Sequence, residues 1–277
     1  MITNKDEALN FLNNKKFNSN YRHCSNIKKK LKDEKNEDNI QFLFKCIEQY
    51  KIYDENFDLN NFDNMTNAWN NYLFFIRKNN NRNGKNIYTS QSKFESTILE
   101  ESVFRMFSNI EDSIIRVGAT KAYSNMYFSP SDFNTFKKET AFKFNTKDQD
   151  FAIYKEVTIN VDNKNENTSI PIVAMECKTY LDKTMLEGSV ATAEKIKNGN
   201  PYCRFCIITE SYEVDFNVDI KSTRLDQIYV LTKSKRRNGE SIIRKDVLEL
   251  LHRDTIKHLK SNWSDVEKNI YEYGIVL

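Results

Sequence analysis

The stretch of sequence that decides the fold runs from Lys147 to Lys178 and reads KDQDFAIYKEVTINVDNKNENTSIPIVAMECK. An acidic residue, Asp150, opens a run of aromatic and β-branched residues with strand character. A polar segment at 162–167 separates this run from a second apolar run. The pattern predicts a β-hairpin with strands at about 150–161 and 169–179.

The second strand ends in Glu176-Cys177-Lys178. Side chains alternate across a strand, so Glu176 and Lys178 share one face and Cys177 points to the other. Apolar residues precede them on both faces, which indicates a strand buried on both sides. A buried charged pair is costly without partners, and a metal ion with a phosphate would supply them.

Such a hairpin would bring Asp150 beside Glu176 on the neighbouring strand. Two carboxylates and a backbone carbonyl form a hard-oxygen site of the kind that suits Mg²⁺. Such a metal polarises a phosphoryl oxygen and lowers the pKa of bound water. Lys178 is then placed to orient that water or to stabilise negative charge in the transition state.

This pattern resembles the PD-(D/E)XK nuclease superfamily and, in its context, a type II restriction endonuclease. Asp150 matches the family aspartate, and Glu176 and Lys178 match the first and last residues of the E-x-K element. In the family these residues bind the metal and assist water attack, and the carbonyl between them, here that of Cys177, often joins the coordination. The chain departs from the pattern at Gln149, where proline is usual.

The family often adds a glutamate from the helix that precedes the hairpin. Here an amphipathic helix is predicted over 92–107, with Glu100 and Glu101 in its middle. Helical angles do not separate the two firmly, and the interpretation favours Glu101 as the additional catalytic carboxylate. The resemblance covers roughly residues 90–232.

The resemblance implies Mg²⁺-dependent, sequence-specific hydrolysis of phosphodiester bonds in double-stranded DNA. It also implies a restriction–modification system with a cognate DNA methyltransferase as a partner. Many such enzymes act as homodimers, because a two-fold protein matches a palindromic site. Two alternatives remain: a structure-specific or repair nuclease with the same core, and a non-catalytic DNA-binding module.

The expected fold is α/β, with a mixed β-sheet nuclease core flanked by helices. Residues 1–86 are expected to form a helical region that clasps DNA, and residues 87–277 the nuclease domain with C-terminal helices. Within the second part, the pattern predicts further helices and strands. The helices are expected at 182–197 and about 244–271, and the strands at 202–209 and 227–232.

Two basic segments are candidate DNA contacts, since Arg, Lys and Asn bind phosphates and base edges. One is a polar break at 77–85, and the other follows the strand at 227–232. The other interpretation of both is a solvated loop. The candidate residues are Arg77, Lys78, Arg82, Lys85, Lys233, Lys235, Arg236 and Arg237.

The bulk composition neither opposes nor establishes DNA binding. The formal net charge is +3, and 29% of the residues are charged, which is ordinary for a globular protein. No apolar run approaches the roughly 20 residues needed to span a bilayer. The N-terminus lacks the apolar core of a signal peptide, so a cytoplasmic location without a membrane partner is expected.

Other chemistries are weaker interpretations. Glu176 and Lys178 could form a plain ion pair at a sheet edge, and Asp148 with Asp150 could form the metal motif of a sugar-nucleotide transferase. That transferase needs a Gly-rich nucleotide-binding turn, which is absent. Cys203 and Cys206 have CxxC spacing but no nearby second ligand pair, so they are expected to be buried thiols. The three histidines are too scattered for a His-based site.

Overall fold

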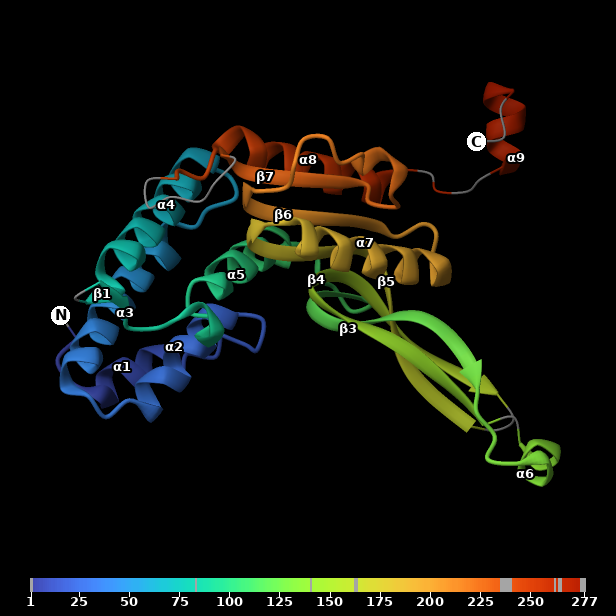
Figure 1. The fold of residues 1–277 in the computed structure, drawn as a ribbon, viewed down its shortest axis with the longest axis horizontal. Coiled ribbons are helices and arrows are strands. Elements are labelled where there is room, and N and C mark those ends of the chain that lie inside the picture. Colours follow the sequence, from blue (N-terminus) through green and yellow to red (C-terminus); the bar gives the residue numbers. More distant parts are fainter. Residues whose placement is uncertain are drawn as a thin grey trace.

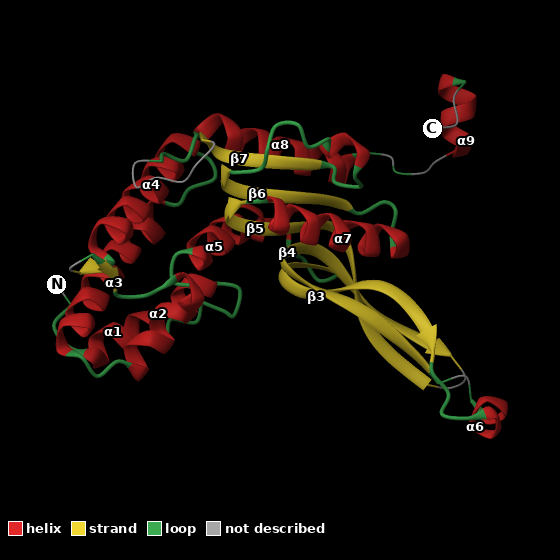
Figure 2. Cartoon of the chain, in the orientation of Figure 1, coloured by secondary structure: helices red, strands yellow, loops and turns green. Residues whose placement is uncertain are grey.

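The computed structural model describes residues 2–82, 84–139, 141–161, 164–234, 241–261, 263 and 266–274. A five-stranded mixed sheet lies at the centre of the fold, and helices flank it (Figure 1, Figure 2). This is the expected fold class, an α/β protein with a mixed sheet and a helical N-terminal region.

The N-terminal region consists of four α-helices followed by a short hairpin. Asparagine side chains at positions 4, 36 and 61 accept hydrogen bonds from first-turn amides, which is a preferred way to begin a helix. Buried aromatic residues, including Tyr50, Trp69 and Tyr72, join these helices to one another. The elements are α1 (Lys5–Leu12), α2 (Arg22–Asp33), α3 (Glu37–Asn56), α4 (Phe62–Asn79), β1 (Asn81–Arg82) and β2 (Lys85–Asn86).

The strand order of the central sheet is β3-β4-β5-β6-β7. The strand β4 pairs antiparallel with β3 and β5, while β5, β6 and β7 run parallel to one another. The strands are β3 (Ile115–Phe128), β4 (Phe142–Val161), β5 (Lys164–Leu181), β6 (Arg204–Tyr212) and β7 (Gln227–Ser234).

Helices cover both faces of this sheet. Apolar residues of α5 and α8 share one core cluster with alternate residues of β4 and β5, such as Phe151, Met175 and Cys177. On the opposite face, Ala193 and Ile196 of α7 pack against Ala174 and Phe205. The remaining helices are α5 (Ser96–Phe107), α6 (Phe133–Lys138), α7 (Lys183–Gly199), α8 (Lys245–Lys260) and α9 (Val266–Lys268).

Short turns of other helix types complete the secondary structure. They are the 3₁₀ helices η1 (Ser90–Ser92), η2 (Ser108–Ile110) and η3 (Ile220–Ser222), and the π-helix η4 (Asn269–Tyr273). The expected C-terminal helix is therefore shorter than its pattern indicates, since α8 ends at Lys260. None of the helices in the described ranges is long and apolar enough to cross a bilayer.

An arm of paired strands extends from the sheet, with α6 at its tip (Figure 1). The hairpin predicted at 150–161 and 169–179 exists, but β4 begins eight residues earlier and pairs there with β3. The strand β3 was not expected. Its outer half alternates poorly because most of its side chains are exposed, so the sequence carries no period-two apolar signal there.

The helix α7 is fixed between β5 and the arm by its ends. Asp182 caps it, as the sequence predicts, by accepting a 2.8 Å hydrogen bond from the Met185 amide. At the other end, Gly199 lies so close to β3 that an added Cβ would stand 2.2 Å from the carbonyl oxygen of Ser124. A residue without a side chain is therefore required where this helix meets the arm.

Gly199→Ala is expected to destabilise the protein by about 1–3 kcal/mol, because a strand carbonyl must move to admit the methyl group. Gly188→Ala in the same helix is the matched control, since nothing lies within 4 Å of its added Cβ. That control should be stabilised by about 0.5–1 kcal/mol through helix propensity. Urea unfolding of both variants measures the difference, and equal effects would refute the close contact.

Candidate active site

The site lies where β4 and β5 part. Phe151 pairs with Met175 in the last regular step between these strands, so Asp150 comes next and lies opposite Glu176. The Asp150 carboxylate turns across this fork, and its Oδ2 accepts a 2.9 Å hydrogen bond from the Cys177 amide. The predicted hairpin therefore brings the aspartate and the Glu-x-Lys element together.

Glu176 is held from two sides. The hydroxyl of Ser189, a buried residue of α7, donates a 2.6 Å hydrogen bond to Glu176 Oε2. Lys178 Nζ lies 3.0 Å from the same oxygen. Burial alone would lower the pKa of Lys178, but the charges of Glu176 and then Asp150 outweigh it and raise that pKa above its ordinary value. Lys178 therefore remains an ammonium ion at neutral pH.

A residue that the sequence did not single out also reaches the site. Arg22, the first residue of α2, places Nη1 2.5 Å from Glu100 Oε2 and 4.0 Å from Asp150 Oδ1. Burial raises the pKa of Glu100, as does the charge of Asp150, while Arg22 opposes this rise. Of the two candidate glutamates on α5, Glu100 is the one that lies in the field of Asp150.

Glu101, the favoured candidate, faces the helical layer and is fully buried there. Its Oε2 accepts hydrogen bonds from the amides of His23 (2.9 Å) and Cys24 (3.0 Å). Its Oε1 accepts from the Tyr50 hydroxyl (2.6 Å) and from Arg105 Nε (3.0 Å). The preference for Glu101 over Glu100 is therefore corrected: Glu101 joins helices, and Glu100 faces Asp150.

The donor set of the fork fits a divalent cation such as Mg²⁺. Within the described ranges no hydrogen bond reaches Asp150 Oδ1 or Glu176 Oε1, so each carboxylate retains an oxygen for a cation. Mg²⁺ commonly binds through one or two carboxylates and keeps several waters. A set of three or more His, Cys, Asp or Glu side chains placed for a metal is absent from the part of the chain that the structure describes.

Thiols are unsuited to such a role here. Burial, and next the charge of Asp150, raises the pKa of the Cys177 thiol well above its ordinary value, which leaves only its backbone carbonyl as a metal ligand. Cys203 and Cys206 are buried and free, as expected, and burial raises the pKa of Cys206 to about 12. They are core residues of the sheet.

The predicted DNA contacts fall in different environments. Arg77 is corrected, because its largely buried guanidinium pairs with Glu210 and lies 3.6 Å from Glu95. Lys78 and Lys85 are exposed. The side chain of Arg82 lies outside what the structure describes.

The second basic segment is described only at its start. Lys233 is half-exposed and lies 2.6 Å from Asp246. Lys235, Arg236 and Arg237 lie outside the described residues, so their expected contact with DNA stays a prediction.

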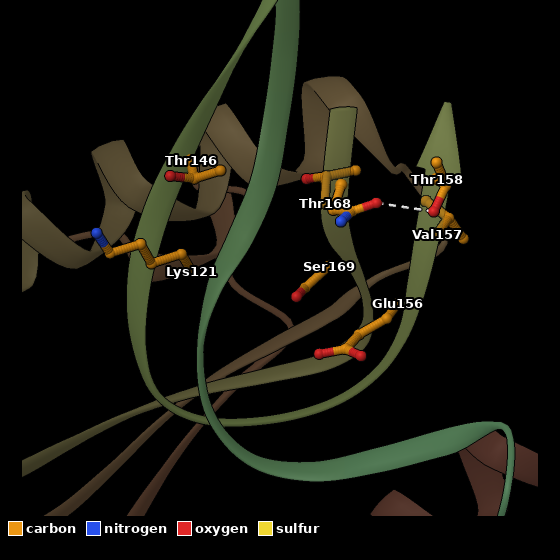
Figure 3. Close-up of a pocket in the computed structure, with 8 residues that line it drawn as sticks. Lys121, Thr146, Glu156, Val157, Thr158, Thr168 and Ser169 are labelled. Atoms are coloured by element: carbon orange, nitrogen blue, oxygen red, sulfur yellow. Dashed lines mark hydrogen bonds between the residues drawn. The ribbon is translucent and has the colours of Figure 1, made fainter. Parts of the chain in front are cut away.

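A polar hollow of about 430 Å³ lies away from these groups, between the strands of the arm. Figure 3 shows the lining residues on three strands: Lys121 on β3, Thr146, Glu156 and Thr158 on β4, and Ser169 on β5. None of the residues of the fork lines it. The hollow is therefore separate from the predicted site at Asp150.

Comparisons with known proteins identify the family and the fold. The family model of the Bpu10I restriction endonuclease matches residues 91–271, a segment that contains the fork and both glutamates of α5. The solved structure of the native BbvCI A2B2 tetramer at low resolution has a similar fold, with a TM-score of 0.69 and 16% identity. That match covers 88% of this chain and 96% of the other. No curated protein sequence matches.

Glu101→Gln is expected to lower the free energy of unfolding by about 3–5 kcal/mol, because it removes one partner of the buried ion pair with Arg105. The matched control is Glu100→Gln, one residue away. Its partner Arg22 is partly exposed, so the expected cost is about 1 kcal/mol or less. Denaturant unfolding of both variants decides, and a control as destabilised as Glu101→Gln would contradict the assignment.

His23 should make the protein acid-sensitive. Burial, and next the charge of Arg105, lowers the pKa of His23 to about 3. In the unfolded chain the histidine binds a proton near pH 6.5, whereas the buried His23 stays neutral. Its contribution to the free energy of unfolding is therefore complete above pH 6.5 and is lost as the pH falls toward 3. The expected loss at pH 5 is about 2 kcal/mol. Urea unfolding at pH 8 and pH 5 should show a flatter dependence for His23→Gln, and identical dependence would refute the effect.

Proposed function

This chain belongs to the Bpu10I restriction endonuclease family, and from that premise we propose that it hydrolyses double-stranded DNA at a specific sequence with the help of Mg²⁺. The family makes it a type II restriction endonuclease. In the proposed reaction, the oxygen of water bonds to phosphorus, one P–O ester bond breaks, and the departing sugar oxygen takes up a proton. The observation that carries the proposal is the fork, where Asp150 meets the Glu176-Cys177-Lys178 element.

Asp150, Glu176 and the carbonyl of Cys177 would hold the metal. When bound, Mg²⁺ polarises the phosphate and lowers the pKa of a water molecule. Two carboxylates that face each other across a strand pair would otherwise repel, so a cation between them also stabilises the fork. Glu100, in place of Glu101, would support this arrangement from α5.

Lys178 would orient the attacking water and stabilise negative charge on the phosphate. Its contact with Glu176 keeps the ammonium at the fork and charged. Ser189 would position Glu176 from α7 through its short hydrogen bond. The proposed catalytic groups Asp150, Glu176 and Lys178 therefore lie on two strands and not on a loop, which favours fixed geometry.

DNA would lie between the helical N-terminal region, residues 1–86, and the arm. Both project from the same side of the sheet and diverge (Figure 1). The exposed Lys78 and Lys85 would contact backbone phosphates, as would the basic segment that begins at Lys233. Arg82, Lys235, Arg236 and Arg237 are proposed to act in the same way.

The family supports a proposal for the biological setting. A restriction endonuclease needs a cognate DNA methyltransferase, which would protect the host genome in the cytoplasm. A homodimer would place two copies of the fork on the two DNA strands. Analytical ultracentrifugation with and without duplex DNA tests that assembly.

Digestion of a long unmodified duplex with Mg²⁺ tests the function. The wild-type protein is expected to give discrete fragments, and Lys178→Ala to lower the cleavage rate by about 100-fold or more, since it removes stabilisation of transition-state charge. Lys183→Ala is the control: it removes the same charge from a side chain that is 74% exposed. EDTA should abolish cleavage.

Other outcomes separate the alternatives. A metal-dependent smear of fragments would indicate a nuclease that cleaves with little sequence specificity. Cleavage of branched DNA alone would favour a repair nuclease. Binding to duplex DNA without cleavage of any substrate would leave a DNA-binding module.

A further inference from the structure

A positively charged side chain, that of Arg22, reaches the fork from outside the segment that matches the family model. Arg22 belongs to the N-terminal helices, whereas the family model matches residues 91–271. Its guanidinium nevertheless lies between Glu100 of α5 and Asp150 of β4. The N-terminal region thus takes part in the site itself.

The position of Arg22 is fixed by the two adjacent glutamates of α5. Glu101 accepts hydrogen bonds from the next two amides of α2, those of His23 and Cys24, and so caps the helix from another element. Tyr21, at the capping position of α2 itself, makes no side-chain cap. Glu100 then binds the Arg22 side chain. Glu101 therefore holds the backbone at the start of α2, and Glu100 holds the Arg22 side chain.

The helix dipole makes this an unfavourable place for an isolated cation. The positive end of a helix dipole lies at its first turn, where acidic residues stabilise and basic residues do not. The first turn of α2 contains Arg22 and no acidic residue. The helix dipole therefore does not favour this arginine, and the anionic side chain that holds it there is Glu100.

Arg22 also has donors to spare. A guanidinium carries five N–H groups in a planar fork that matches a phosphate. Among the described residues, the side chain makes one hydrogen bond, from Nη1 to Glu100 Oε2. The 4.0 Å to Asp150 is too long for another, and the side chain is 31% exposed. The remaining donors are therefore accessible beside the aspartate.

We propose that Arg22 binds the scissile phosphate and stabilises the charge that develops on it during cleavage. The inference rests on the proposed function and deepens it. Glu100 orients the guanidinium beside Asp150, which would hold Mg²⁺ and so the phosphate next to it. The helical region is thereby a part of the catalytic apparatus as well as a clasp.

The test compares Arg22→Gln and Arg22→Lys with Arg253→Gln. Glutamine retains a donor for Glu100 but removes the positive charge. Lysine retains the positive charge but lacks the planar set of guanidinium donors. Arg253 lies on α8, remote from α2 (Figure 1), with a side chain that is 73% exposed. The measurements are thermal melting, single-turnover cleavage with Mg²⁺, and the salt dependence of binding to a short fluorescent duplex with Ca²⁺ in place of Mg²⁺.

Arg22→Gln is expected to melt near the wild-type temperature and to cleave about 100-fold more slowly. The plot of log affinity against log salt concentration has a negative slope, and its magnitude should decrease by about 0.9, the value for one phosphate contact. Arg22→Lys should keep the slope and recover part of the rate, because an ammonium is a point charge. Arg253→Gln should match wild type.

An unchanged rate and slope in Arg22→Gln would overturn the proposal. So would a lower melting temperature with an unchanged slope, since that marks a purely structural ion pair. If the wild-type protein cleaves no DNA, the proposed function fails instead. The salt slope still decides whether Arg22 contacts a phosphate.

Discussion

The site depends on one buried carboxylate, that of Glu101. It accepts hydrogen bonds from the start of α2, from Tyr50 of α3 and from Arg105 of its own helix. A buried charge without partners costs several kcal/mol, so these contacts must form together as the helices pack. Arg105 in turn binds Asp54 at 2.9 Å, which extends the constraint along α3.

This constraint explains why the adjacent residues Glu100 and Glu101 have different partners. Successive residues of an α-helix point about 100° apart. Once Glu101 is fixed among the helices, Glu100 turns toward the fork, where Arg22 and Asp150 lie. The N-terminal helices and the sheet are thus joined through two neighbouring side chains of α5. A shift of α2 would displace Arg22 from the fork.

The sequence could predict the fork because its signals are local. Two short strands joined by a polar turn define the hairpin, and the period of two places Glu176 and Lys178 on one face. The choice between Glu100 and Glu101 had no such signal. Every residue of α5 from Thr97 to Phe107 is buried, so its apolar pattern identifies no preferred face.

The other differences come from contacts between distant parts of the chain. Arg77 lies in a basic segment that resembles a DNA-binding loop, but Glu210, far along the chain, neutralises it in the fold. Arg22 precedes Glu100 by 78 positions and belongs to no motif. A run of charged residues shows only which charges are neighbours in the sequence. The ion-pair partner of each residue depends on how distant parts of the chain pack.

Packing also bears on the division of the chain at residues 86 and 87. A single core cluster extends from Ala8 in α1 to Leu251 in α8 and includes Phe151 and Met175 of the sheet. Without the N-terminal helices, Glu101 and Arg105 would lose the tyrosine and amide partners that neutralise them, and the apolar side of α5 would face water. The helical region is therefore part of the same core as the strands that form the fork.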